Sequence, residues 1–157
     1  MTLFLSTFLN KIDKKGRISV PASFRQALAT QPFQGIAAFR SYKGDAIEAC
    51  ALSRMERLSE SVDTLDMFSE EHDDMSSILF ADAHQLAFDS EGRIMLPDEL
   101  REHAGITTTA CFVGRGATFQ IWNPDTFKIH QEEARVRLRE RGATLRLSKE
   151  TPPKGEN

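Results

Sequence analysis

The sequence predicts an α+β protein, mainly β, in which two copies of one short unit share a single core. The first observation is a repeated motif: residues 13–25 read DKKGRISVPASFR, and residues 89–101 read DSEGRIMLPDELR. The second is a pair of short apolar strands around a turn after each copy. The third is helical patterning between the copies and after the second one. Two copies at so long a spacing indicate duplicated halves rather than a solenoid.

Each copy of the motif predicts a turn, a short strand and a short helix. Asp13 can accept hydrogen bonds from the backbone that follows it, and Gly16 supplies the positive φ of such a turn. The strand spans residues 18–20, and Pro21 ends it and suits the start of a helix. The helix is expected at residues 22–29. The second copy repeats these positions with Asp89, Gly92, residues 94–96 and Pro97.

The short helix of each copy has one apolar face. Phe24 and Leu28 lie four positions apart in the first copy, as do Leu100 and Ala104 in the second, so each pair shares a face. Gly105 is a suitable C-terminal stop for the second helix.

The other strands lie on either side of each motif. Residues 3–11 predict an edge strand that leads into the first turn. Four segments predict two hairpins, one in each half: 36–40 with 46–51, and 110–113 with 119–122. Gly-Arg-Gly-Ala at 114–117 can also be read as a phosphate cradle, but no Lys-Ser/Thr and no helix start follows it. A hairpin turn is the favoured interpretation.

Two helices are expected between the copies. Ser53 with Glu56 matches a capping box, with Ser at the N-cap and Glu three residues later. An apolar stripe follows that pattern: Leu52, Met55, Leu58, Val62 and Leu65. The second helix is expected to start near Ser69, because the acidic residues after it are favourable at the positive end of a helix dipole.

A last helix is expected from Asn123, as N-cap, to about Gly142, with Pro124 at its first position. Charges alternate along it, which favours a solvated helix with one packing edge, formed by Phe127, Ala134 and Leu138. The chain is therefore expected to divide into four parts: a first repeat (3–58), a helical insert (59–86), a second repeat with the last helix (87–142) and a flexible tail (143–157).

Composition places the chain among soluble globular proteins. Its 157 residues are 40% hydrophobic and 27% charged, and no stretch approaches the roughly 20 apolar residues of a membrane span. The first ten residues lack the basic start of a signal peptide and are interpreted as a strand. Cys50 and Cys111 are isolated in apolar surroundings, which indicates buried thiols and a reducing compartment.

The net charge of −3 conceals a strong polarity along the chain. Residues 1–43 hold seven Lys/Arg and one Asp, whereas residues 44–91 hold two Arg and 13 Asp/Glu. This pattern favours one basic face and an acidic insert that lies against a basic surface of this chain or another. The alternative, that both segments are only solvated surface, stays open.

The sequence offers no recognisable catalytic or metal site. The four histidines are scattered. His72 with Asp73 and Asp74, and His130 with Glu133, come closest to a ligand cluster, but they lack the spacing of a metal site. No Gly-x-Ser-x-Gly elbow occurs, and neither cysteine has an evident histidine partner. We therefore expect neither an enzyme nor a bound cofactor.

A duplicated basic turn remains as the candidate functional feature. Lys14 and Lys15 suit phosphates, and Arg17 beside Gly16 can approach a guanine edge closely. The alternative is structural: Arg17 pairs with Asp13, and Arg93 pairs with Asp89, so that each arginine fixes its own turn.

The two turns differ in charge. Three basic residues and one acidic residue give the first turn (residues 13–17) a formal charge of +2, whereas one basic and two acidic residues give the second (residues 89–93) −1. Phosphate attraction dominates non-specific DNA affinity. Only the first turn is therefore expected to face DNA, and the structural role falls on Asp13 and on Asp89, Gly92 and Arg93.

The chain resembles the MraZ family of bacterial transcriptional regulators, which belongs to the AbrB-like (SpoVT-AbrB) DNA-binding superfamily. The likeness rests on the two motifs at 13–21 and 89–97, on residues 79–88, and on Ile-Trp-Asn-Pro at 121–124. It spans about residues 3–140. Two features depart from the family pattern: Ala-Cys-Ala at 49–51 is smaller than the usual bulky run, and Met55 stands where an aromatic residue is usual.

The resemblance implies two AbrB-like halves with swapped hairpins that interlock in one pseudo-twofold β-barrel, and chains that assemble into a ring. It implies a cytoplasmic, nucleoid-associated regulator without a cofactor. Such a regulator binds direct repeats in double-stranded DNA upstream of the division and cell-wall gene cluster, usually as a repressor. The DNA-contacting loop of the family maps to Lys14, Lys15, Gly16 and Arg17, and the weaker candidates near it are Lys11 and Arg25.

Two other classes stay open. One is an antitoxin-like interaction protein, because AbrB-like folds also neutralise toxins. A long disordered tail would favour it, whereas residues 143–157 form a short, polar tail interpreted as lacking apolar anchors. The other is an enzyme in a small barrel, which would need a metal or nucleotide site that the sequence does not offer.

Overall fold

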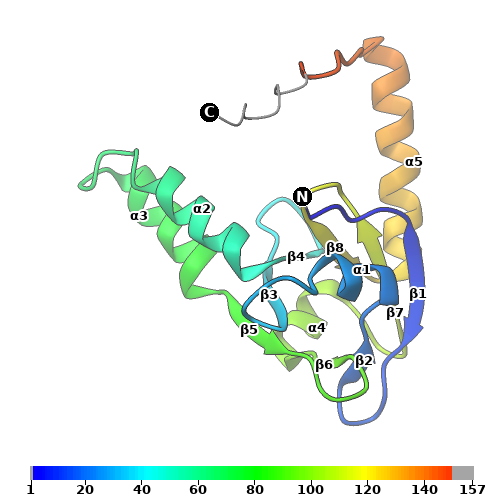
Figure 1. Ribbon diagram of the computed structural model, residues 1–157. Helices are drawn as coiled ribbons and strands as arrows, with labels where there is room; N and C mark the ends of the chain where they lie inside the picture. The colour runs from blue at the N-terminus through cyan, green and yellow to red at the C-terminus, as the bar shows by residue number, and fades with distance from the viewer. Residues whose placement is uncertain (1, 150–157) are drawn as a thin grey trace, which may run out of the picture.

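The computed structural model describes residues 2–149, and in it the two copies of the motif pair with each other (Figure 1). The strands form a six-stranded antiparallel sheet and a separate two-stranded ribbon. They are β1 (Thr7–Lys11), β2 (Arg17–Ser19), β3 (Gly35–Arg40), β4 (Ile47–Cys50), β5 (His84–Ala87), β6 (Arg93–Met95), β7 (Thr109–Gly114) and β8 (Phe119–Trp122). The helices are α1 (Ala22–Ala27), α2 (Leu52–Val62), α3 (Glu70–Ser76), which continues as a π-helical turn (Ser77–Ala81), α4 (Asp98–Ala104) and α5 (Pro124–Arg141).

The strand order relates the two halves by a twofold pattern. The six-stranded sheet runs β1-β7-β8-β4-β3-β5, and the ribbon pairs β2 with β6. When β1 to β4 are equated with β5 to β8, this order reads the same from both edges. The first strand of each half pairs with the hairpin of the other half, β1 with β7 and β5 with β3. The two halves therefore depend on each other for their strand pairing.

The expected closed β-barrel is wrong, because the six-stranded sheet stays open between its edge strands β1 and β5. β2 and β6 are three residues long and pair with each other, so they form a ribbon of their own instead of bridging the two edges. The chain links the ribbon to β1 through an isolated bridge between Ile12 and Ile18. The predicted combination of helices with antiparallel β-hairpins is confirmed. The expected predominance of β structure is not, because helices hold more of residues 2–149 than strands do.

A single large core is built from both halves. Phe24 of α1 is 1% exposed, and its ring centroid lies 5.2 Å from that of Phe4 and 4.9 Å from that of Phe119. Truncation of a buried phenylalanine to alanine costs about 3–5 kcal/mol. The four residues of the predicted helix faces are buried, which confirms them: Phe24, Leu28, Leu100 and Ala104.

The insert is a helical hairpin that projects from the sheet at the left of Figure 1. The predicted capping box at Ser53 is wrong, because α2 starts directly after β4, with Ala51 as N-cap, and Ser53 already lies in the first turn. Met55 and Val62 are buried on the predicted stripe. Ser69 caps α3 as predicted, and its hydroxyl accepts a hydrogen bond from the backbone N–H of His72 at 3.1 Å.

The helical insert also ends earlier than expected. β5 occupies residues expected to belong to the insert, and the sequence alone gives no prediction of a strand there. Residues 84–87 are few and both polar and apolar, so they form a strand only because they pair with β3.

Helix α5 projects on the side of the molecule opposite the insert (Figure 1). Asn123 caps it as predicted, accepting a hydrogen bond from the backbone N–H of Asp125 at 2.9 Å. Phe127 is buried against Trp122, but Leu138 is 57% exposed, so the packing edge is shorter than predicted. In the described part of the chain, no helix combines the length and apolar character that a bilayer crossing requires.

Part of the expected flexible tail lies outside the described residues, namely 150–157. The described part, 143–149, has no regular secondary structure. It exposes Leu145 and Leu147 almost completely, at 96% and 97%. These two exposed leucines count against the expectation that the tail lacks apolar anchors.

Candidate nucleic-acid interface

The ribbon of β2 and β6 lies at the lower end of the molecule in Figure 1, away from the insert and from α5. Arg17 pairs with Met95, Ile18 with Ile94, and Ser19 with Arg93. Successive side chains of a strand point to opposite faces, and both isoleucines are buried at 1% exposure. Arg17 and Arg93 therefore share the outward face of one short ribbon.

The first glycine turn is held by Asp13. One carboxylate oxygen, Oδ1, accepts hydrogen bonds from the backbone N–H groups of Lys15 and Arg17, both at 2.9 Å. The other, Oδ2, accepts one from Nε of Arg17 at 2.7 Å. Gly16 has φ +86°, which an L side chain adopts only with strain. The turn thus fixes both its own backbone and the direction of Arg17.

The second glycine turn repeats this geometry. Asp89 accepts hydrogen bonds from the N–H groups of Glu91 and Arg93 at 2.9 Å and from Nε of Arg93 at 2.8 Å. Gly92 has φ +76°. The predicted structural role of Asp13, Asp89, Gly92 and Arg93 in the turns is in keeping with these contacts, and Arg17 makes the same kind of contact.

The hydrogen bonds to the two aspartates change their protonation. Donation from the backbone N–H of Arg17, together with the Arg17 side chain, holds the pKa of Asp13 below its ordinary value of 3.8. The backbone N–H of Arg93 and then that of Glu91 lower the pKa of Asp89 in the same way. Both carboxylates are therefore ionised at neutral pH and can hold their arginines.

The two turns have the same geometry but differ in charge. Lys14 and Lys15 are exposed and make no ion pair within residues 2–149. In the second turn Ser90 and Glu91 replace them, and Glu91 lies 3.4 Å from Nη1 of Arg93. Arg93 therefore faces two carboxylates, whereas Arg17 faces one.

The last residue of each motif reaches across to the glycine of the other copy. A Cβ atom placed on Gly92 would lie 2.6 Å from Cζ of Arg25, and one placed on Gly16 would lie 3.3 Å from Nη1 of Arg101. Arg25, predicted as a weaker DNA contact near the first turn, lies instead at the second. Arg101 lies at the first and is not among the predicted site residues. Its equivalence to Arg25 in the repeat is the signal that could have identified it.

The other candidate residues are Lys11 and the histidines with nearby carboxylates. Lys11 is exposed at the end of β1, next to Ile12, which bridges to Ile18 of the ribbon. His72 lies 3.9 Å from Asp63 within the insert, and His130 stacks on Trp122 with ring centroids 4.6 Å apart. No group of three or more His, Cys, Asp or Glu side chains among the described residues is arranged to hold a metal ion. The segment at 114–117 is the predicted hairpin turn between β7 and β8.

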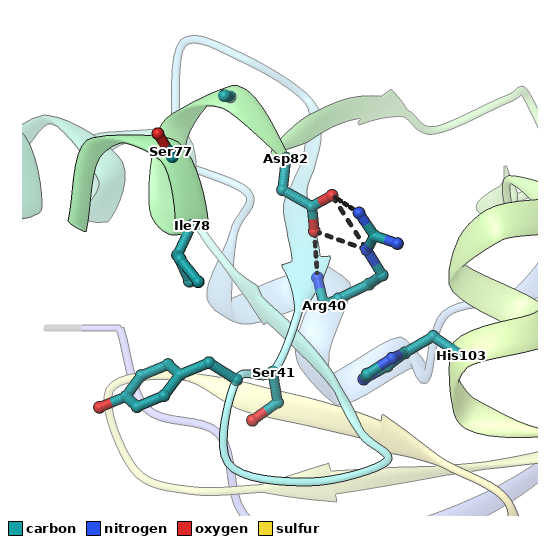
Figure 2. A pocket seen from close by; sticks show the side chains of 8 residues that line it. Arg40, Ser41, Ser77, Ile78, Asp82 and His103 are labelled. Carbon is teal, nitrogen blue, oxygen red and sulfur yellow. Dashed lines mark hydrogen bonds and ion pairs between the residues drawn. The ribbon is translucent and has the colours of Figure 1, made fainter. Parts of the chain in front are cut away.

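A separate hollow of about 530 Å³ lies beside the base of the insert (Figure 2). Arg40 on its wall is bound to Asp82: Nη2 donates to Oδ1 at 2.6 Å, Nε donates to the same oxygen at 3.0 Å, and the backbone N–H donates to Oδ2 at 2.8 Å. These contacts tie the end of the insert to β3. Arg40 thus has a structural role, and its charge is already paired with Asp82 and is not free for a ligand.

Comparison with known proteins places both motifs in one family. A family model described as "MraZ protein, putative antitoxin-like" matches residues 3–38 and 79–148. A protein of Rickettsia canadensis (strain McKiel) named Transcriptional regulator MraZ is 47% identical over 146 residues, covering 93% of this chain and 98% of that protein. The chain belongs to the MraZ family. A Rickettsia bellii (strain OSU 85-389) protein of the same name is 47% identical over 147 residues with the same coverage.

The parts matched by the MraZ family model include both glycine turns and both cross-repeat arginines. They leave out residues 39–78, which contain α2 and α3. The residues that form the ribbon and its turns in this chain thus lie within the parts that match the MraZ family model.

Proposed function

We propose that this MraZ family member regulates transcription by binding double-stranded DNA with its first glycine turn. The observation that carries the proposal is a pair of exposed lysines beside Arg17, whose Nε is fixed by Asp13. The Nη1 and Nη2 groups of Arg17 make no hydrogen bond within the described residues. Lysines neutralise phosphates, and two terminal N–H groups of an arginine can donate to O6 and N7 of guanine.

The contact surface consists of Lys14, Lys15, Gly16 and Arg17. Gly16 is itself buried and supports this surface through its positive φ, which sets the path of the turn that carries the three side chains. Lys11 is a secondary candidate, exposed at the end of β1. Arg25 contacts DNA in this scheme only if the second turn does, because it lies on Gly92.

The proposal extends to the organisation of the chain. Two AbrB-like repeats, predicted at residues 3–58 and 87–142, swap strands around the insert predicted at 59–86. The twofold strand order supports two equivalent halves, with β5 (His84–Ala87) as the first strand of the second one. The chains assemble into a ring. The first glycine turns of several chains in that ring bind short direct repeats in DNA at the same time. The ring is cytoplasmic and nucleoid-associated, and it represses the promoter of the division and cell-wall gene cluster.

Selection of bound DNA from a random pool with the purified full chain tests this function. The expected result is enrichment of short sequences repeated in tandem, because several identical turns read the DNA at once. Recovery of no enriched sequence at moderate salt would overturn sequence-specific DNA binding.

A second candidate function is antitoxin-like binding of another protein. The words of the family description and the exposed Leu145 and Leu147 favour it. Removal of residues 143–157 discriminates the two functions. A DNA-binding regulator keeps its DNA affinity without the tail, whereas a tail-mediated antitoxin loses its protein partner in a co-purification from the source cells.

A further inference from the structure

Arg101 occupies the first glycine turn although it belongs to the second repeat. Its Nη1 would lie 3.3 Å from a Cβ placed on Gly16, so the guanidinium covers that glycine directly. The ribbon fixes this arrangement, because the backbone N–H of Leu96, at the end of β6, donates to the carbonyl oxygen of Gly16 at 2.8 Å. Helix α4, which carries Arg101, begins two residues after Leu96. The position of Arg101 therefore follows from the pairing of the two repeats.

The charge of Arg101 is only weakly neutralised by the protein. Its nearest carboxylate is that of Asp98, at 4.0 Å from Nη2, on a side chain that is 87% exposed. Nε of Arg101 is buried and has no hydrogen-bond partner among the described residues. By contrast, Arg93 lies 2.8 Å and 3.4 Å from two carboxylates. Arg101 thus brings an available positive charge to a turn that already carries Lys14 and Lys15.

Arg25, the counterpart of Arg101, is placed differently. Its Nε donates to the backbone carbonyl oxygen of Val20 at 3.1 Å, so it is bound to the protein. It lies over Gly92, in the turn that contains Asp89 and Glu91. With the cross-repeat arginines included, four basic residues and one acidic residue give the first turn a formal charge of +3. The second turn has two basic residues, Arg25 and Arg93, and two acidic residues, Asp89 and Glu91, so its formal charge is zero.

We propose that Arg101 is a phosphate-contacting residue of the DNA interface, supplied to the first turn by the second repeat, and that Arg25 has no such role. This inference rests on the proposed DNA-binding function. It makes the interface a composite of both halves: Lys14, Lys15 and Arg17 come from one repeat, and one cation comes from the other. A single repeat could not form this surface.

The test compares three variants of the full chain: Arg101→Gln, Arg101→Lys and Arg25→Gln. DNA affinity is measured against salt concentration, with the wild-type protein and a DNA recovered from the selection experiment. Each lost phosphate contact reduces the steepness of log K against log salt by about 0.9. Melting temperature and assembly size are measured on the same samples.

Arg101→Gln is expected to bind more weakly, with a salt slope shallower by at least about 0.9, and with little change in melting temperature or assembly size. Arg101→Lys, which keeps the charge, is expected to retain the wild-type slope. Arg25→Gln, the matched control, is expected to melt at lower temperature and to keep the slope.

Wild-type affinity and slope for Arg101→Gln would overturn the proposal, and so would an equal loss of slope in Arg25→Gln. If neither Arg101 variant folds, Arg101 is a structural residue and the proposal fails. Failure of the wild-type protein to bind any DNA is a different result, because it overturns the proposed function itself.

Discussion

One aspartate in each glycine turn fixes the backbone of that turn, and the two aspartates make matching hydrogen bonds. Asp13 and Asp89 each accept two backbone N–H groups and one arginine Nε, so the local geometry of the two copies is the same. The difference lies in the side chains that project from each turn, two lysines in the first and Ser90 with Glu91 in the second. Charge, not turn geometry, therefore distinguishes the turn that we propose to bind DNA from the other one.

Replacement of Arg17 by alanine is expected to abolish operator binding while the fold survives, because a half-exposed turn arginine contributes little to stability. Arg93→Ala is the matched variant, and it is expected to destabilise the fold or the assembly, because Arg93 pairs with two carboxylates, Asp89 and Glu91, where Arg17 pairs with one. Melting temperature, assembly size and DNA affinity are measured for both. If Arg93→Ala keeps its melting temperature and size but loses DNA binding as fully as Arg17→Ala, both turns contact DNA and the charge argument is wrong.

Acid is expected to weaken the first turn. The pKa of Asp13 is lowered in the folded protein, so its contribution to stability is present above its ordinary pKa of 3.8 and is lost as the pH falls through the lowered value. Asp13→Asn should therefore lower the melting temperature at pH 7, and the difference from the wild-type protein should shrink below pH 3.8. A difference that stays constant down to pH 2 would contradict this assignment.

At the scale of elements, close backbone contacts hold the N-terminal segment on β7. The backbone N–H of Gly114 donates to the carbonyl oxygen of Ser6 at 2.8 Å, and Phe4 and Gly116 exchange two backbone hydrogen bonds. This contact seats the fully buried Phe4 in the shared core. It requires a glycine at position 114, because a Cβ there would lie 2.5 Å from the carbonyl oxygen of Phe4.

Gly114→Ala is accordingly expected to lower the free energy of unfolding by about 1–3 kcal/mol, the usual cost of overpacking. Gly44→Ala is the control, since a Cβ on Gly44 meets no atom within 4 Å. That substitution is expected to change stability by less than about 1 kcal/mol. Urea denaturation midpoints with unchanged m-values measure both effects. Equal losses in the two variants would show that the contact with Phe4 is not the cause.

On the scale of the whole molecule, the acidic insert and the basic turn lie at different ends (Figure 1). None of the four acidic residues of α3 pairs with a Lys or Arg within the described residues. Met67 and Phe68 at the tip of the insert are 71% and 92% exposed. The expectation that the insert lies against a basic surface of its own chain is therefore not met. Contact with another chain remains the proposal.

A closed multimer is the expected state in solution, because contacts between different surfaces of identical chains form rings when they close. Light scattering at micromolar concentration should give several times the chain mass of 17.7 kDa. A particle of 17.7 kDa under these conditions would rule out the assembly.

Binding by such a multimer should depend steeply on salt. Several first turns would release counterions together, and each phosphate contact contributes about −0.9 to the slope of log K against log salt. A slope shallower than about −2 would mean that one or two phosphates are engaged, and it would contradict binding by several chains at once.

The sequence by itself determined the local units of this protein. The turn at Asp13, the proline after each short strand, the buried face of Phe24 and the cap at Asn123 depend on neighbours within a few residues. Such hydrogen bonds and periodicities are visible in the order of residues. The charge of the first turn, and with it the candidate site at Lys14, Lys15 and Arg17, is local in the same sense.

Only the tertiary structure decided which units meet. β5 becomes a strand because β3 lies beside it, the sheet stays open because β2 and β6 pair with each other, and Arg101 reaches Gly16 because the two copies of the motif are neighbours in space. These contacts join residues far apart in the chain. Their free energy comes from pairing and packing between distant segments, which local propensity does not encode.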